Sequence, residues 1–143
     1  MAGERVLLVD DEEEFVEALS ERLTMRDMRV TTAANGPQAL DRCREGKFDA
    51  IILDLAMPGM DGIETLRAMR ELDPEVQVIL LTGRGTVKKS IEAMKLGAMD
   101  FLEKPVEMEV LLSRIKEARN IGQEIETKKS EAIIAEILRT KGW

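Results

Sequence analysis

The sequence contains no histidine, no tyrosine and a single cysteine, Cys43. The lack of histidine excludes serine–histidine and cysteine–histidine nucleophile pairs, and it excludes histidine-ligated metal sites. One cysteine cannot form an internal disulfide, nor can it build a thiolate metal site by itself. Aromatic residues make up only 3% of the chain, so leucine, isoleucine, valine and the nine methionines must fill the core.

The chain also lacks an excess of positive charge and a long apolar run. Its formal net charge is −7, which argues against sequence-independent binding to nucleic acid or to an anionic membrane. Asp10 comes too early for a signal peptide, and no apolar run approaches membrane-spanning length. We therefore expect a cytoplasmic protein with no direct nucleic-acid or membrane partner. An acidic cluster that holds a cation is still compatible with this charge.

Short apolar runs alternate with helical patterns along the chain. Five runs predict strands, over residues 6–9, 28–33, 50–53, 76–81 and 99–102. The first, third and fourth do not alternate with polar residues, which is typical of strands buried on both faces of a parallel sheet. Helical spacing follows each run, as in Phe15, Leu19 and Leu23. Five strand–helix units predict one α/β domain, with a doubly wound parallel sheet and helices on both faces.

A further helical pattern follows the fifth unit. It passes through Ile121 and Ile125, fades over residues 126–131, and returns with a shifted phase over residues 133–138. We divide the chain into a domain, residues 4–120, and a C-terminal helical tail or linker, residues 121–143. The tail folds back on the domain, meets a partner chain or leads towards an output module, and the sequence does not separate these alternatives.

Residues with chemical potential follow four of the predicted strands. Asp10 and Asp11 follow the first, Asp54 follows the third, Thr82 follows the fourth and Lys104 follows the fifth. In a doubly wound sheet, ligands bind beyond the carboxyl ends of the strands. Carboxylates gathered there repel one another unless a cation neutralises them, and Mg²⁺ prefers oxygen ligands. A carboxylate can also form an aspartyl-phosphate, with a lysine and a hydroxyl binding the phosphoryl oxygens.

Each of these residues has a simpler explanation when it is taken alone. Acidic residues at 10–14 can stabilise a helix start, and an aspartate or threonine after a strand is ordinary turn chemistry. Four strand ends that each carry a suitable residue are hard to obtain from capping alone. The combination therefore favours a phosphoryl-transfer site.

Four segments together resemble the receiver domains of two-component response regulators, the CheY-like family. The segments are VLLVDDE, IILDLAMPGMDGIE, ILLTGRG and GAMDFLEKP, in the family's order. The resemblance covers roughly residues 4–120. It implies the flavodoxin-like fold with the strand order 2-1-3-4-5.

The resemblance also implies a ligand set. Asp54 matches the phosphoacceptor of the family. The residues that would hold Mg²⁺ are Asp10, Asp11, Asp54 and, through its backbone carbonyl, Ala56. Since the chain has no histidine, the phosphodonor is expected to be a phosphohistidine on a separate sensor histidine kinase. The receiver would catalyse this transfer and its own dephosphorylation, without being a turnover enzyme on an external substrate.

The remaining matches concern the conformational switch. Lys104 matches the phosphoryl-binding lysine and precedes a cis peptide bond to Pro105, whereas Thr82 and Phe101 match the switch pair. After phosphorylation, Thr82 would move to a phosphoryl oxygen and Phe101 would rotate inward. The face made by the fourth helix, fifth strand and fifth helix would then change its binding of a partner or a second copy, and the tail is an alternative dimer contact. The competing explanation is that Phe101 simply packs in the core.

Ala56 and Arg84 lie where the family tunes the lifetime of the phosphoryl group. Alanine cannot orient an attacking water, so we expect slow self-dephosphorylation. Two rival functions are a haloacid-dehalogenase-type phosphatase and a pseudo-receiver that binds proteins without phosphorylation. The phosphatase requires a second aspartate at the position where this chain has Ala56. A pseudo-receiver does not need the full set of site residues, so the presence of all of them argues against it.

Overall fold

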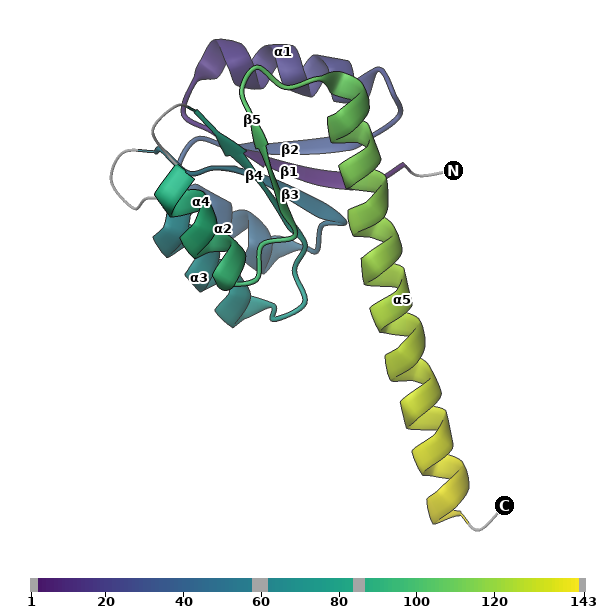
Figure 1. Ribbon diagram of the computed structural model, residues 1–143. Helices are drawn as coiled ribbons and strands as arrows, with labels where there is room; N and C mark the ends of the chain where they lie inside the picture. The colour runs from purple at the N-terminus through teal and green to yellow at the C-terminus, as the bar shows by residue number, and fades with distance from the viewer. Residues whose placement is uncertain (1–2, 58–61, 84–86, 142–143) are drawn as a thin grey trace.

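Five strands form one parallel sheet in the order β2-β1-β3-β4-β5 (Figure 1), as the sequence predicts. The computed structural model describes residues 3–57, 62–83 and 87–141. The strands are β1 (Arg5–Val9), β2 (Arg29–Ala33), β3 (Ala50–Asp54), β4 (Val78–Thr82) and β5 (Asp100–Glu103). The β4 strand begins two residues later than predicted, and β3 and β4 each run one residue further, to Asp54 and Thr82. These two side chains therefore stand on strand ends that the ladder holds in place.

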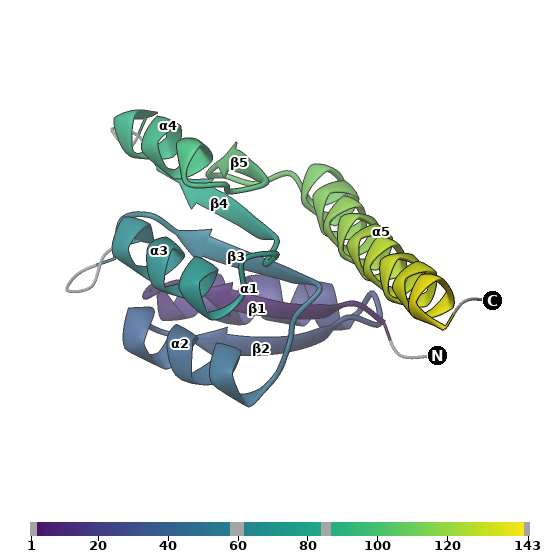
Figure 2. The same cartoon turned by 90° about the horizontal axis from the view of Figure 1, so that it is seen from below.

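Helices cover both faces of the sheet, as Figures 1 and 2 show from two directions. They are α1 (Glu13–Thr24), α2 (Gly36–Glu45), α3 (Gly62–Leu72), α4 (Val87–Lys95) and α5 (Met108–Thr140). α1 and α5 pack on one face, whereas α2, α3 and α4 pack on the other. The expected doubly wound architecture is thus confirmed.

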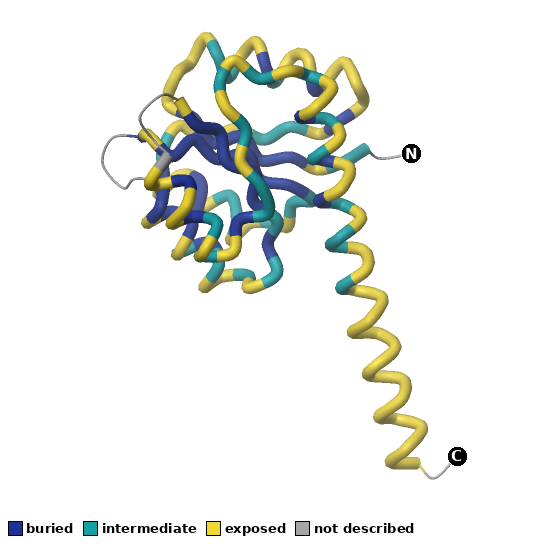
Figure 3. The backbone as a smooth tube through the Cα atoms, in the orientation of Figure 1, coloured by how far each residue is buried: buried dark blue, intermediate teal, exposed yellow. Residues whose placement is uncertain are grey.

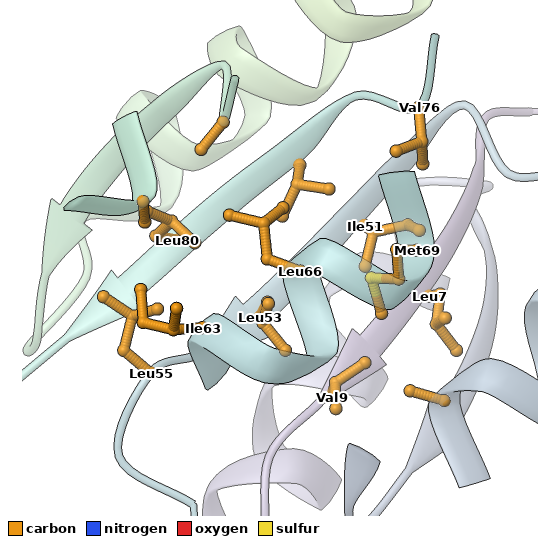
Figure 4. Close-up of a cluster of buried hydrophobic side chains, with 14 of the residues drawn as sticks. Leu7, Val9, Ile51, Leu53, Leu55, Ile63, Leu66, Met69, Val76 and Leu80 are labelled. Carbon is orange, nitrogen blue, oxygen red and sulfur yellow. The ribbon is translucent and has the colours of Figure 1, made fainter. Parts of the chain in front are cut away.

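The alternation of side chains along the strands divides the core between these two faces. Leu7 and Leu53 point towards α2 and α3, where they contact Leu66 and Met69 (Figure 4). Leu8 and Ile52 point to the other face and pack with α1 and α5. β1, β3 and β4 are buried almost throughout, which explains their continuous apolar sequences. Each fully buried aliphatic side chain stabilises the fold by roughly 1.5–3 kcal/mol.

The tail is the continuation of α5, a helix of 33 residues with no break between residues 120 and 121. Leu111, Ile115 and Ala118 are fully buried, but residues 126–141 are all exposed (Figure 3). The helix runs past the sheet and away from it (Figure 1), so the tail does not fold back on the domain. Within the described ranges, no helix is both long and apolar enough to cross a membrane.

Candidate functional site

The carboxyl ends of the strands bring the predicted residues to one edge of the sheet. The ladder pairs Val9 of β1 with Leu53 of β3, so Asp10 and Asp54, which follow them, lie on neighbouring strands. Thr82 ends β4, and the backbone N–H of Lys104 donates to its carbonyl at 2.8 Å, which extends the ladder beyond β5. Residues separated by up to 94 positions in the chain therefore converge at this edge.

Lys104 is the centre of the charged cluster. Its Nζ lies 2.8 Å from Oδ2 of Asp10 and 3.2 Å from Oε1 of Glu12, and it donates hydrogen bonds to both. Oδ2 of Asp54 is further away, at 3.7 Å, which is an ion pair without a hydrogen bond. The ammonium also lies 4.4 Å from the ring centroid of Phe15. One cation is therefore shared among three carboxylates.

The two aspartates of the cluster are buried, with side chains only 0% (Asp10) and 5% (Asp54) exposed. Each is also fixed by a backbone donor. The N–H of Glu12 donates to Oδ1 of Asp10, and the N–H of Ala56 donates to Oδ1 of Asp54, both at 3.0 Å. This leaves Oδ2 of each carboxylate directed towards the lysine side of the cluster.

The electrostatics of the cluster are not fully balanced. Burial raises the pKa of Asp54, and the charges of Asp10 and Asp11 raise it further, against the opposing effects of the Ala56 N–H and Lys104. For Lys104, burial lowers the pKa, but the hydrogen bond to Asp10 and the nearby carboxylates outweigh it, so the pKa is raised overall. The site thus holds more negative charge than its single lysine neutralises.

An additional cation suits this arrangement. Carboxylate oxygens of Asp10, Glu12 and Asp54 all lie within 4.8 Å of one another. An all-oxygen donor set is what a hard divalent cation such as Mg²⁺ prefers. Burial, and after it the charges of Asp10 and Asp11, raise the pKa of Asp54, and such a cation would oppose these effects by favouring the ionised carboxylate. Asp11, the predicted partner in this role, is exposed, and Glu12 takes its place in the geometric cluster.

The switch pair is divided between interior and surface. Thr82 is buried, and its hydroxyl donates to the carbonyl of Leu102 at 3.4 Å. Phe101 is 43% exposed on β5. The competing explanation, in which Phe101 is a core residue, is therefore wrong for this conformation.

Two further predicted features concern the loops. The Lys104–Pro105 peptide bond is cis. Ala56 is exposed directly after the strand that carries Asp54. Arg84, the other residue expected to tune the phosphoryl lifetime, lies outside the described residues.

Gly62 is a site residue that sequence reasoning missed. It begins α3, and its N–H donates to the carbonyl of Leu55 at 3.3 Å. A Cβ at this position would lie 2.5 Å from Cα of Leu55 and 2.9 Å from the carbonyl oxygen of Asp54. Only glycine allows this approach, so Gly62 lets the start of α3 pack directly against the backbone of Asp54 and Leu55. The signal was present in the sequence, since glycine is unfavourable in a helix without a reason of this kind.

An apolar cavity of about 510 Å³ adjoins the cluster on the α1 side. Phe15 and Leu19 of α1 line one wall, and Lys104, Pro105 and Val106 line another. In contrast, Cys43 has no part in the site. Burial and the charge of Asp73 raise the pKa of its thiol to about 11, which agrees with the role of a small apolar residue.

Comparisons with known proteins agree with this geometry. The family model of the response regulator receiver domain matches residues 6–116. The transcriptional regulatory protein YkoG of Bacillus subtilis, which is described as uncharacterised, is 38% identical over 113 residues, covering 79% of this chain and 50% of that protein. The transcriptional regulatory protein ZraR of Klebsiella oxytoca is 39% identical over 120 residues, covering 82% of this chain and 27% of that protein. This chain thus spans half or less of these relatives.

A solved structure of a response regulator receiver domain protein from Clostridium thermocellum has the same fold. It superimposes with a TM-score of 0.83 at 31% identity, covering 86% of this chain and 99% of that one. The family match covers most of the strand–helix units, including all four strand ends that build the site. The chain therefore belongs to the response regulator receiver domain family of two-component signalling.

Proposed function

We propose that this chain is a phosphorylation-operated switch whose phosphoacceptor is Asp54. The observation that carries the proposal is the buried ion-pair network in which Lys104 links Asp10 and Asp54 at the carboxyl edge of the sheet. A fold does not need two buried carboxylates and a lysine at this position, because a buried ion pair usually gives no more stability than apolar residues of similar volume would give. Phosphoryl transfer, by contrast, needs a nucleophilic carboxylate and positive charge beside it.

The transfer would proceed by attack of a carboxylate oxygen of Asp54 on the phosphorus of a phosphohistidine. An O–P bond forms to Asp54, the P–N bond of the donor breaks, and the electron pair stays on the imidazole of the sensor kinase. Oδ1 of Asp54 is held by the N–H of Ala56, which leaves Oδ2 as the attacking atom. The kinase would meet the chain in the cytoplasm.

The ligands proposed for Mg²⁺ are the carboxylates of Asp10, Asp11 and Asp54 with the backbone carbonyl of Ala56, and Glu12 is an added candidate because of its place in the cluster. When bound, the cation would supply charge neutralisation for the carboxylates and for the phosphoryl oxygens. Lys104 and Thr82 are proposed to bind those oxygens directly. Lys104 lies 3.7 Å from Oδ2 of Asp54, so a small shift away from Glu12 would bring it to a phosphoryl group on that atom.

The proposed output is a change in surface shape. Thr82 would exchange its hydrogen bond to the Leu102 carbonyl for one to a phosphoryl oxygen, which allows Phe101 to turn inward. Ile91 of α4 is 54% exposed, Phe101 of β5 is 43% exposed and Val110 of α5 is 36% exposed, so this face carries three apolar side chains. Burial of Phe101 would alter the face, and with it the affinity for a partner or a second copy.

The named relatives are transcriptional regulatory proteins that are longer than this chain. We infer that any DNA contact belongs to other regions of such proteins, since this chain carries a net charge of −7. The part of the output that belongs to this chain is contact with protein.

The lifetime of the phosphoryl group is proposed to be long. Ala56 has no polar atom on its side chain, so it cannot orient a water molecule for attack on the phosphorus. A half-life of many minutes is expected for the purified phosphorylated chain. Decay within seconds, measured as loss of the phosphoryl mass, would contradict this part of the proposal.

The test is incubation of the purified chain with acetyl phosphate, followed by intact mass measurement. A gain of one phosphoryl group is expected with Mg²⁺, and no gain is expected with a chelator or in Asp54→Asn. Asp41→Asn, which removes an exposed carboxylate of α2, is the matched control and should be labelled like the wild type. Absence of labelling in a chain shown to be folded would favour the pseudo-receiver alternative.

A further inference from the structure

The projecting end of α5 carries a group of apolar side chains that the domain does not cover. We name it the tail patch; its members are Ile133, Ile134, Ile137 and Leu138, and they are 60%, 56%, 48% and 43% exposed. With 3.6 residues per turn, the centre of the patch lies roughly 100° around the helix from the buried side chains Leu111, Ile115 and Ala118. Ile133, five helical turns after Ile115, keeps the side of α5 that packs on the sheet, and the other three side chains turn progressively away from it.

The domain ends its contact with α5 just before the patch. Ile125 lines a groove with the loops at the opposite edge of the sheet from the site, and Nζ of Lys129 donates to Oε2 of Glu75 at 2.5 Å. From residue 130 onwards the helix extends into solvent, as Figures 1 and 3 show. Residues 130–141 span about 18 Å at 1.5 Å per residue, a length that a second helix can pack along.

The charges that flank the patch are self-complementary. Glu131 precedes it and Lys141 follows it, and neither has an ion-pair partner within the described parts of the chain. The centre of the patch falls between residues 135 and 136, so an antiparallel second copy would set Ile133 opposite Leu138 and Ile134 opposite Ile137. The same arrangement sets Lys141 of each copy opposite Ser130 of the other, one residue from Glu131. A parallel pair in register would instead place Lys141 beside Lys141.

We propose that the tail patch is a homodimer contact in which two α5 helices pack antiparallel through residues 130–141. The occupant is a second copy because the apolar positions match themselves after reversal, and each lysine then lies one residue from the position opposite the glutamate of the other copy. The contact does not depend on phosphorylation of Asp54. It also leaves the two domains at opposite ends of the helix pair, where neither obstructs the other.

The area of the patch sets the strength of the contact. Four half-exposed aliphatic side chains bury on the order of 300–400 Å² per copy, which is less than half of the roughly 800 Å² per partner of a standard stable interface. We therefore expect a weak dimer, with a dissociation constant on the order of 100 µM. Any second contact between the same two chains would be strengthened by this one.

The test is sedimentation equilibrium on the unphosphorylated chain, up to about 1 mM, a range set by the expected affinity. The wild type should dimerise, and Ile134→Gln with Ile137→Gln should remain monomeric. Glu131→Lys and Lys141→Glu should each weaken dimerisation about tenfold, because each replaces two attractions by two repulsions. The double variant should restore the wild-type constant to within about twofold, since its charges are again complementary.

Lys128→Glu is the matched control. It makes the same change of charge on another side of the helix, where Lys128 pairs with Glu124, and it should leave dimerisation unchanged. Helix content measured by circular dichroism should be equal in all variants. A monomeric wild type at the highest concentration would overturn the proposal. So would a dimer that survives both glutamine substitutions, or one that is indifferent to the single reversals, because it would use another face or a parallel arrangement.

Discussion

The carboxyl edge of the sheet and the projecting end of α5 depart from the usual distribution of residues in opposite ways. At the edge, the carboxylate side chains of Asp10 and Asp54 are 0% and 5% exposed. In the tail, Ile133 and Ile134 are 60% and 56% exposed. Buried charges and gathered exposed apolar side chains are both rare in a domain that only has to fold. Each region therefore points to a function, but of a different kind.

The carboxyl edge is suited to chemistry, whereas the projecting end of α5 is suited to association with another chain. The edge is a coupled unit, in which Lys104, three carboxylates and the backbone after Asp54 hold one another in place. Changes there should alter the stability of the whole domain. The tail beyond residue 130 contacts solvent on all sides, so changes there should alter only what the chain binds.

Lys104→Met should destabilise the domain by about 2–4 kcal/mol, because it leaves buried carboxylates without their cation. Urea unfolding at neutral pH measures the effect. Lys89→Met, on the exposed side of α4, is the control and should change the unfolding free energy by less than about 0.5 kcal/mol. Equal effects of the two substitutions would show that the cluster at the edge does not act as a unit.

The same glycine substitution should change stability in opposite directions at the start of α3 and in the middle of α5. Gly62→Ala forces a Cβ to within 2.5 Å of Cα of Leu55 and should cost about 1–3 kcal/mol. Gly122→Ala meets no atom within 4 Å and should stabilise the chain by about 0.5–1 kcal/mol, through helix propensity. Thermal or urea unfolding of both variants is sufficient. If both variants lost stability, or both gained it, the difference in packing between these two helix positions would not explain the result.

Asp54→Asn should stabilise the chain at pH 7, in the absence of divalent cations, by roughly 1–2 kcal/mol. Because the pKa of Asp54 is raised in the folded state, protonation of this carboxyl group stabilises the folded chain. This contribution is complete below the unfolded-state pKa of 3.8 and is lost as the pH rises through the folded-state pKa. The advantage of asparagine should therefore shrink as the pH falls towards 3.8.

Unfolding curves of both proteins across this pH range provide the measurement. Glu17→Gln, an exposed neutralisation on α1, should show no such pH-dependent difference. In the wild type, addition of Mg²⁺ should recover part of the stability, since a cation that binds only the folded state stabilises it. A loss of stability in Asp54→Asn at pH 7 would contradict the idea that the buried, ionised carboxylate lowers the stability of the fold.

Ile134→Gln with Ile137→Gln should give the smallest effect on folding, below about 0.5 kcal/mol, because both side chains are already about half exposed. Their effect on self-association should be large, as proposed above. Leu111→Gln, in the buried part of the same helix, is the contrasting variant and should destabilise the domain by several kcal/mol. Similar losses for both changes would mean that the tail belongs to the cooperative core.

The fold and most of the site were predictable from the sequence, since each buried strand is recognisable as an apolar run that ends at a polar residue. Asp10, Asp54, Thr82 and Lys104 could be placed together on that basis, because parallel strands share a carboxyl edge. The prominence of Glu12 over Asp11 could not. It depends on the extended backbone of Glu12 at the start of α1, with φ −84° and ψ 97°, which brings its carboxylate to Lys104.

The tail was only partly predictable. Its helical character and shifted phase were visible in the sequence, but the polar residues 126–131 and Gly122 were equally compatible with a turn. In the structure these polar residues are simply the solvated part of one continuous helix. The exposure of Phe101 was likewise hidden, since an aromatic residue on a strand is ordinarily buried.

The central claim is that the carboxylate of Asp54 receives the phosphoryl group, and locating that group tests it most directly. The chain would be treated with acetyl phosphate and Mg²⁺ and then with borohydride, which reduces an acyl phosphate to an alcohol and leaves a free carboxylate intact. Peptide mass spectrometry would then find the reduced residue. Reduction at Asp54, lost when Mg²⁺ is chelated, is the predicted result. Reduction at Asp10, Asp11 or Glu12, or at no residue in a folded chain, would contradict the account.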